Sequence, residues 1–296
     1  MADNPDGFDS DPYESGAYET PPVQIAVGDL TFDVAVWGPR SGTPIVLLHG
    51  FPETAASWRG VADRLADAGM RVYAPNQRGY SPGARPDGVD AYRTEVLAAD
   101  IVGLLDALDI PDAHLVGHDW GAVVAWIVAA KNPNRVTSLT AVSIPHPAAF
   151  GWAVREDPDQ QQRSSYFNLF RQEGNAEHVL QKDDSTALRS LFGDSVPSDL
   201  IQAHVDLLSE PGALTAALNW YRAMSSDMEQ LPAVTVPTTY VWSTGDLAMG
   251  RAGAERCSEF VDAPYEFLIL DDATHWIPEE RPRDLADAVL SRAGLR

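Results

Sequence analysis

The sequence predicts an α/β protein in which helices cover both faces of a mostly parallel sheet. Segments with strand and helix patterns alternate regularly from residue 23 onward. Several strand segments, "PIVLLHG" (44–50) among them, are continuous apolar runs, as expected for strands buried on both faces. The segment "HLVGHDWGAVVAW" (114–126) has the pattern of a strand, a tight turn and a helix. Repeated strand–helix units of this kind build parallel sheets.

Each predicted element has its own signal. "VQIAVGD" (23–29) and "TFDVAVWG" (31–38) flank a short turn and suit an antiparallel pair. The helix over 54–69 has apolar residues at helical spacing and ends at Gly69, a residue typical of helix ends. The helix over 94–110 carries one apolar stripe. The other strands are expected over 44–50, 71–76, 113–118, 136–144, 238–243 and 265–270, and further helices over 120–132 and 282–292.

The alternation stops over residues 148–232, which contain helical stretches and no clear strand. We therefore expect an all-helical lid between the sixth and seventh strands. The core then comprises residues 23–147 and 233–296. Residues 1–22 are rich in Asp, Glu, Gly, Pro and Ser and contain no Lys or Arg, a composition that predicts a disordered acidic tail.

Composition narrows the function classes. The 296 residues carry 21 basic and 43 acidic side chains, a net charge of −22, which disfavours binding to nucleic acid or anionic membranes. The negative net charge also favours a neutral substrate over a small anion. No apolar run approaches the ~20 residues of a membrane-spanning helix, and no signal-peptide pattern is present. The lone Cys257 excludes an intramolecular disulfide and a cysteine-based metal site. These features predict a cytoplasmic protein, either a monomer or a homodimer.

The turn in residues 114–126 carries the first candidate catalytic residue. Gly117 and Gly121 bracket Asp119, in the position where many enzymes place the serine of a G-x-S-x-G turn. A sharp turn between a strand and a helix needs small neighbours, and the amino end of the helix favours negative charge on Asp119. Asp is also a good N-cap residue, so this motif alone leaves a purely structural role open.

Two later loops favour a catalytic role. Asp246 follows one predicted strand, in "STGDLAMG", and His275 follows the next, in "DDATHWIP". The order nucleophile, acid, histidine, each after a strand, is that of an α/β-hydrolase triad. The loop "HGFPE" (49–53) follows the third strand, where this fold supplies a backbone N–H to an oxyanion hole. Phe51 and Trp120 are the expected donors.

With these motifs in order, the chain resembles the soluble epoxide hydrolases of the α/β-hydrolase superfamily along nearly its whole length after the tail. "HGFPE", "GHDWG", "IPHP", "GD" at 245–246 and "THW" at 274–276 carry the resemblance. It implies an eight-stranded sheet with a helical lid. In the lid, "SYFNLFRQEGNAE" and the more specific "LNWYRAM" resemble the family's two tyrosine segments, which gives those roles to Tyr166 and Tyr221.

This resemblance explains a carboxylate in the nucleophile position. Asp119 would attack an sp³ epoxide carbon and form an ester, whereas a serine would form an ether that water cannot cleave. Tyr166 and Tyr221 would donate to the leaving oxygen. Water activated by His275, which Asp246 orients, would then release a vicinal diol. No metal or organic cofactor is needed. The substrate is expected to be an apolar epoxide, in a pocket formed by residues that include Pro145, Phe150, Leu218, Leu247, Met249 and Trp276, besides Phe51 and Trp120.

Other functions remain as alternatives. A haloalkane dehalogenase shares the aspartate, the histidine and "DWG", and it would stabilise a halide through N–H donors such as Trp120 and Trp152 or Trp220. Its common asparagine after "HG" is replaced here by Phe51. A fluoroacetate-type dehalogenase is disfavoured because no arginine follows Asp119 in "DWGAVVAW". A non-catalytic binder would leave a complete triad unexplained, and a serine esterase lacks its G-x-S-x-G motif.

Overall fold

The protein is built around one eight-stranded sheet, seen here in a computed structural model that describes residues 22–295. The strands lie in the order β1-β2-β4-β3-β5-β6-β7-β8. Pairs β1–β2 and β2–β4 are antiparallel, and all other pairs are parallel. The strands are β1 (Val23–Val27), β2 (Leu30–Trp37), β3 (Thr43–Leu48), β4 (Met70–Pro75), β5 (Ala113–His118), β6 (Val136–Val142), β7 (Thr238–Ser243) and β8 (Tyr265–Leu270). The predicted fold class and its mostly parallel sheet are confirmed.

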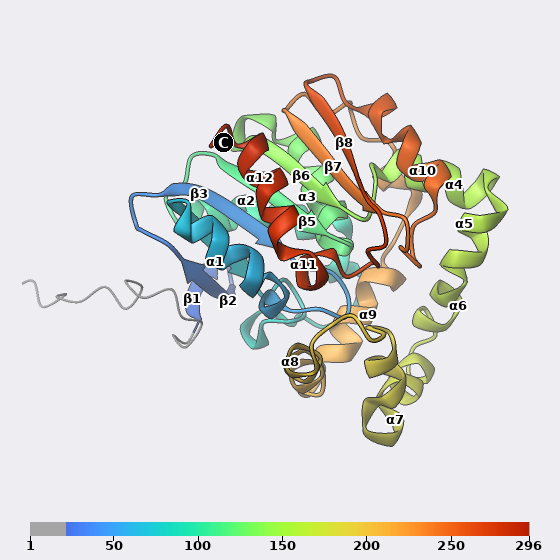
Figure 1. Ribbon diagram of the computed structural model, residues 1–296. Helices are drawn as coiled ribbons and strands as arrows, with labels where there is room; N and C mark the ends of the chain where they lie inside the picture. Colours follow the sequence, from blue (N-terminus) through green and yellow to red (C-terminus); the bar gives the residue numbers. More distant parts are fainter. Residues whose placement is uncertain (1–21, 296) are drawn as a thin grey trace, which may run out of the picture.

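Helices cover both faces of the sheet because side chains alternate along each buried strand. On β3, Ile45 and Leu47 pack with α1 (Arg59–Asp67) and α12 (Pro282–Arg292). Val46 and Leu48 belong to the core on the other face, with α2 (Thr94–Ala107) and α3 (Trp120–Lys131). In Figure 1, α1 and α12 lie in front of the sheet and α2 and α3 behind it. Burial on both faces explains why the central strands are continuous apolar runs.

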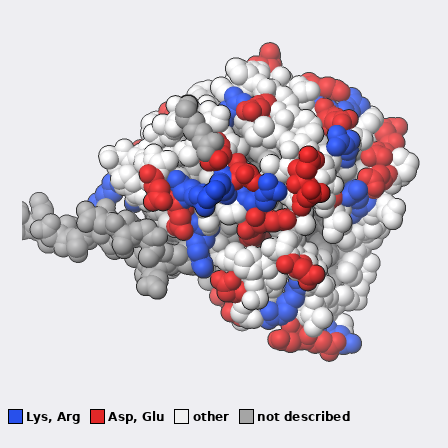
Figure 2. Space-filling model, in the orientation of Figure 1, with Lys and Arg blue, Asp and Glu red and all other residues white. Residues whose placement is uncertain are grey.

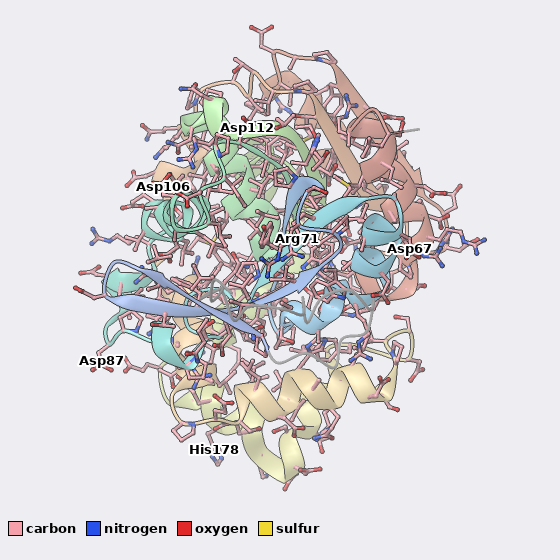
Figure 3. All side chains as sticks on the ribbon, turned by 90° about the vertical axis from the view of Figure 1, so that its left-hand side faces the viewer. Asp67, Arg71, Asp87, Asp106, Asp112 and His178 are labelled. Atoms are coloured by element: carbon pink, nitrogen blue, oxygen red, sulfur yellow. The ribbon has the colours of Figure 1, made fainter. Side chains whose placement is uncertain are left out.

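Helices alone fill the chain between β6 and β7, as the sequence predicts. They form a layer beside and below the carboxyl ends of the strands, with α4 and α5 on the right of Figure 1 and α7 and α8 at the bottom. His178, on α7, lies at the lower end of the molecule in Figure 3. These helices are α4 (Pro147–Glu156), α5 (Pro158–Arg163), α6 (Phe167–Phe170), α7 (Asn175–Ser190, interrupted at Lys182–Ser185), α8 (Ser198–Leu208) and α9 (Ala213–Arg222).

Short helices complete the connections between these elements. Two lie near the carboxyl ends of β7 and β8, namely α10 (Arg251–Glu255) and α11 (Ile277–Glu280). The 3₁₀ helices are Ala55–Trp58, Pro82–Ala84, Val89–Tyr92, Pro133–Arg135, Ser164–Tyr166, Ser226–Glu229 and Arg256–Phe260. The helix predicted over 54–69 is therefore a 3₁₀ turn followed by α1, with Gly69 just beyond the end at a positive φ.

The surface carries charges of both signs. On the face shown in Figure 2, acidic side chains extend along the right-hand edge and the bottom, and basic side chains gather nearer the middle. Within residues 22–295, no helix combines the length and the apolar character needed to cross a membrane. The predicted acidic tail lies outside the described residues except for residue 22.

Candidate active site

Asp119 occupies a strained turn between β5 and α3. Its backbone has φ 50° and ψ −120°, a conformation that L-residues rarely adopt. Gly121 is needed there because a Cβ at this position would overlap the carbonyl oxygen of Leu48. The carboxylate makes no capping hydrogen bond to α3, and it accepts the Phe51 N–H at 2.9 Å instead. The purely structural role as a helix cap is therefore not supported.

His275 and Asp246 reach the same point from the ends of β8 and β7. The Nε2 of His275 lies 3.7 Å from Oδ2 of Asp119, and its Nδ1 lies 3.0 Å from Oδ1 of Asp246. Asp246 also accepts the N–H groups of Ala248 and Met249, at 2.8 and 3.0 Å. These bonds hold Asp246 so that it can orient the imidazole. The three residues predicted as a triad thus form one connected, buried group.

The buried charges shift one another's pKa values. Burial alone lowers the pKa of His275, but the carboxylate of Asp246 and then that of Asp119 outweigh it and raise the pKa to about 9. Burial also raises the pKa of Asp119, and His275 and the Phe51 N–H oppose this effect. The pKa of Asp246 is lowered, because His275 and its backbone donors outweigh burial. The charge of His275 thus favours the ionised form of both carboxylates.

An Asp246→Asn substitution is expected to lower the pKa of His275 well below about 9. The amide removes the largest contribution that raises this pKa and leaves burial, which lowers it, in place. The measurement is a titration of the His275 ring by NMR in the free protein. An unchanged pKa would show that Asp246 does not set the charge of this ring. Asp271→Ala, at the exposed end of β8, is the matched control, since Asp271 contributes nothing to His275.

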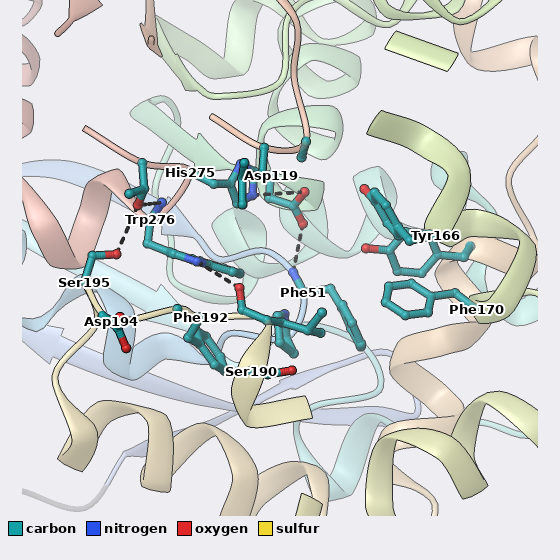
Figure 4. A pocket seen from close by; sticks show the side chains of 17 residues that line it. Phe51, Asp119, Tyr166, Phe170, Ser190, Phe192, Asp194, Ser195, His275 and Trp276 are labelled. Atoms are coloured by element: carbon teal, nitrogen blue, oxygen red, sulfur yellow. Dashed lines mark hydrogen bonds and ion pairs between the residues drawn. The ribbon is translucent and has the colours of Figure 1, made fainter. Parts of the chain in front are cut away.

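The triad opens into a cavity of about 610 Å³, within the range of small-molecule sites. Tyr166 and Tyr221 form part of its wall, with Tyr221 buried and Tyr166 partly buried, and their ring centres lie 6.2 Å apart. Burial, followed by the charge of Asp119 for Tyr166 and by the neighbouring phenol for Tyr221, raises both pKa values well above 10. Figure 4 shows Tyr166 across the cavity from His275, with Asp119 between them. Both phenols therefore stay protonated and can donate.

The predicted wall of the pocket is correct only in part. Phe51, Leu247 and Trp276 line the main cavity. Trp120 and Phe150 line a smaller cavity that also borders Asp119. Pro145, Leu218 and Met249, in contrast, line neither cavity and are packed in the interior. The sequence pattern around these three residues indicates burial, and it does not show whether a buried side chain faces a cavity or the packed core.

Part of the cavity wall was not predicted from the sequence. It is formed by Phe170 and by residues 190–195 at the end of α7. The indole N–H of Trp276 donates to the Leu191 carbonyl in this segment at 3.2 Å. Ser195 and Thr274 join this loop to the loop after β8, with 3.1 Å between their hydroxyls. Figure 4 shows Phe192 and Trp276 side by side on this wall. Neither residue spacing nor charge in 190–195 signals its position.

A buried ion pair behind the triad also escaped the sequence analysis. Nδ1 of His118 lies 2.8 Å from Oε2 of Glu53, and its Nε2 lies 2.8 Å from the His275 carbonyl. Burial raises the pKa of Glu53, but the charge and hydrogen bond of His118 outweigh it, so the carboxyl is ionised. These two contacts fix the orientation of the His118 ring beneath the loop that carries His275. Both residues lie in the motifs "HGFPE" and "GHDWG", but only other residues of these motifs, Phe51, Asp119 and Trp120, were predicted to act in the site.

No site for a metal is evident in the part of the chain that the structure describes. Across residues 22–295, no three His, Cys, Asp or Glu side chains are grouped so that they could hold a metal ion. The cavity wall contains no Lys or Arg side chain. Besides the exposed Asp194 and the hydroxyls of Ser190, Ser195 and Thr274, the site offers a buried carboxylate, a histidine–aspartate pair and two phenols.

Comparisons with known proteins agree with this geometry. The family described as alpha/beta hydrolase fold matches residues 43–282. The chain is 35% identical over 273 residues to AB hydrolase superfamily protein YfhM of Bacillus subtilis, covering 90% of this chain and 95% of that protein. It is 34% identical over 294 residues to epoxide hydrolase A of Mycobacterium tuberculosis, with 84% and 90% covered. The crystal structure of epoxide hydrolase A from Mycobacterium thermoresistibile matches with a TM-score of 0.81 and 29% identity, covering 92% and 98%.

Proposed function

The chain belongs to the epoxide hydrolases of the α/β-hydrolase fold family, and we propose that it converts an apolar epoxide to a vicinal diol through an ester on Asp119. The observation that carries this mechanism is the placement of two protonated phenols in the wall of the cavity into which Asp119 opens. A nucleophile and acids that share one cavity suit an opening reaction in which a carbon is attacked while its oxygen leaves. Residues 148–232 act in this proposal as the lid that brings the phenols to the core.

In the first step, an oxygen of Asp119 attacks one ring carbon, and the C–O bond of the ring breaks with its electron pair going to the oxygen. Tyr166 or Tyr221 gives that oxygen a proton, so the product is a hydroxy ester and a phenolate. A proton from the imidazolium of His275 then reaches the phenolate through water in the cavity, since Tyr166 lies across the cavity from His275. This transfer is downhill, because the pKa of His275 is about 9 and those of the phenols lie well above 10. His275 is left neutral, as a general base must be.

In the second step, His275 takes a proton from water, and the hydroxide attacks the ester carbonyl carbon. Ester formation has already removed the charge of Asp119, one of the contributions that raise the pKa of His275. The Phe51 N–H is hydrogen-bonded to the Asp119 carboxylate, and the Trp120 N–H follows directly at the start of α3, so that both are candidates to hold the tetrahedral oxyanion. When the intermediate collapses, the diol oxygen takes the remaining proton from the Asp119 carboxyl. The sum is one epoxide and one water converted to one diol.

The cavity suits a halide leaving group less well. A dehalogenase needs N–H donors beside the nucleophile, and Trp120 is one candidate, but the asparagine that commonly follows "HG" is replaced here by Phe51. The Trp220 indole donates to the Arg78 carbonyl at 3.0 Å, and Trp152 is not part of the cavity wall. The alternative of a haloalkane dehalogenase is therefore disfavoured by the donors that it would require.

Two assays on the same purified protein test the proposed function. Diol formation from styrene oxide is expected, and halide release from bromoalkanes and chloroalkanes is not. The Tyr166→Phe/Tyr221→Phe double variant should lose about 10³-fold in kcat, because it retains the nucleophile and lacks both proton donors. A Tyr73→Phe variant, which lies outside the cavity wall, is the matched control. Halide release without diol would overturn the proposal, and an active double variant would remove the phenols from the mechanism.

A further inference from the structure

Asp119 lies where two cavities of very different size meet. The larger one, of about 610 Å³, extends between Phe51, the loop 190–195 and Trp276. The smaller one, of about 30 Å³, extends between α3, α4 and the segment after α9. Both are lined by Asp119, Tyr166, Tyr221 and Ala248, so that the nucleophile and both phenols stand at their junction. We refer to the two spaces as the wide arm and the narrow arm.

The narrow arm has room for little more than one or two water-sized groups. A single water needs roughly 10–15 Å³ of such space, and the narrow arm offers about 30 Å³. Its walls are apolar, and two of them are the thioether side chains of Met224 and Met228. A phenyl ring or an alkyl chain of several carbons cannot enter without displacing these side chains. The wide arm accepts either group as it stands.

The methionines separate the narrow arm from a third cavity. This outer cavity, of about 150 Å³, shares Pro147, Phe150, Phe167, Met224 and Met228 with the narrow arm. Arg171 contacts the side chains that separate the two cavities. Its guanidinium donates to Sδ of Met224 at 3.4 Å and to the Tyr221 carbonyl at 3.1 Å, and it lies 5.5 Å from the centre of the Phe167 ring. Shortening the methionines would therefore join the two spaces.

The chemistry of ring opening relates the arms to the substrate. When the phenols hold the ring oxygen and Asp119 attacks one carbon, the two ring carbons lie side by side at the junction. In a trans-epoxide the substituents on the two carbons point away from each other, so that one of them needs space in each arm. We infer, on the basis of the proposed function, that this enzyme acts on terminal epoxides, which carry one large group for the wide arm and only hydrogens for the narrow arm. Met224 and Met228 impose this selectivity.

Styrene oxide and trans-stilbene oxide test this inference in the unmodified protein. Styrene oxide carries a phenyl ring on one of its two epoxide carbons. Trans-stilbene oxide carries a phenyl ring on each of them. We expect kcat/KM for trans-stilbene oxide to be at least about 100-fold lower, the penalty of forcing several extra atoms into a filled space. Comparable values would overturn the inference and leave the proposed function intact. If neither epoxide gives a diol, the proposed function fails and the inference fails with it.

A Met224→Ala/Met228→Ala variant tests which residues close the narrow arm. We expect the ratio of the two kcat/KM values to shift toward trans-stilbene oxide by about 10-fold or more, because the narrow arm then opens into the outer cavity. Met70→Ala removes the same side chain from β4, in the core on the other face of the sheet, and should leave the ratio unchanged. An unchanged ratio in a folded double variant would overturn the role of the methionines, as would a shift in Met70→Ala. If the double variant does not fold, Met224→Ala alone is measured in the same way.

Discussion

In a His275→Gln variant, one molecule of epoxide is expected to alkylate the protein and then to remain attached. The first step needs Asp119 and the phenols, which the substitution leaves in place, but glutamine cannot take a proton from the attacking water. Steady-state turnover should fall by about 10⁵-fold, as when the base of a catalytic triad is removed. Intact-protein mass spectrometry should show one added epoxide mass per chain, and peptide mapping should place it on Asp119.

The matched control for this variant is His178→Gln. His178 is an exposed histidine on α7, at the lower end of the molecule in Figure 3, and its replacement should change neither turnover nor mass. An unmodified His275→Gln protein that has lost turnover would contradict the two-step mechanism, because His275 would then be required before the ester forms. Retained turnover would remove His275 from the mechanism altogether.

The sequence was sufficient to predict elements whose residues show a regular pattern. The central strands are apolar throughout because both of their faces are covered, and this pattern located β3 and β5 closely. The triad was predictable for a related reason. In a parallel sheet the carboxyl ends of the strands lie along one edge, so residues directly after β5, β7 and β8 converge. The placement of Asp119, Asp246 and His275 directly after their strands was enough to expect the three side chains to lie together.

The cavity was less predictable because it depends on how separate helices pack. Leu218 and Tyr221 both lie on α9 and are both buried, yet only Tyr221 reaches the cavity. An apolar pattern shows that a side chain is buried and does not show whether a cavity lies beside it. The loop 190–195 has no periodic pattern at all, and its place in the wall depends on Trp276 and Thr274, which are about 80 residues further along the chain.

The pair formed by Glu53 and His118 illustrates a different limit. Sequence alone gives the charge of such residues and not their burial, and a surface glutamate is the ordinary expectation. Here the glutamate is completely buried, and Nδ1 of His118 lies 2.8 Å from its Oε2. β5 ends at His118 and Asp119 lies in the turn after it, so the strand pattern does not show where the two side chains point. Nor does it identify the backbone carbonyl of His275 as the partner of Nε2 of His118.

An Asp119→Ala variant is expected to lose at least about 10⁵-fold in turnover, because Asp119 is the carboxylate that lines both cavities together with the phenols, whereas Asp194, another carboxylate in the main cavity wall, is exposed. The loss alone does not identify the covalent step, since a carboxylate could also activate water. A single turnover of the unmodified enzyme in water enriched in ¹⁸O separates these roles. If Asp119 is the nucleophile, the diol takes its new oxygen from the carboxylate, and the label appears in the Asp119 peptide.

The Asp119→Ala/His275→Gln double variant completes this test. It should acquire no epoxide mass, whereas the single His275→Gln variant is alkylated. Asp271→Ala, which removes an exposed carboxylate at the end of β8, should retain both turnover and labelling of Asp119. Label found in the first diol and absent from the Asp119 peptide would mean that water attacks the epoxide directly. Asp119 would then serve as a base, and its Phe51 N–H partner would have no oxyanion to hold.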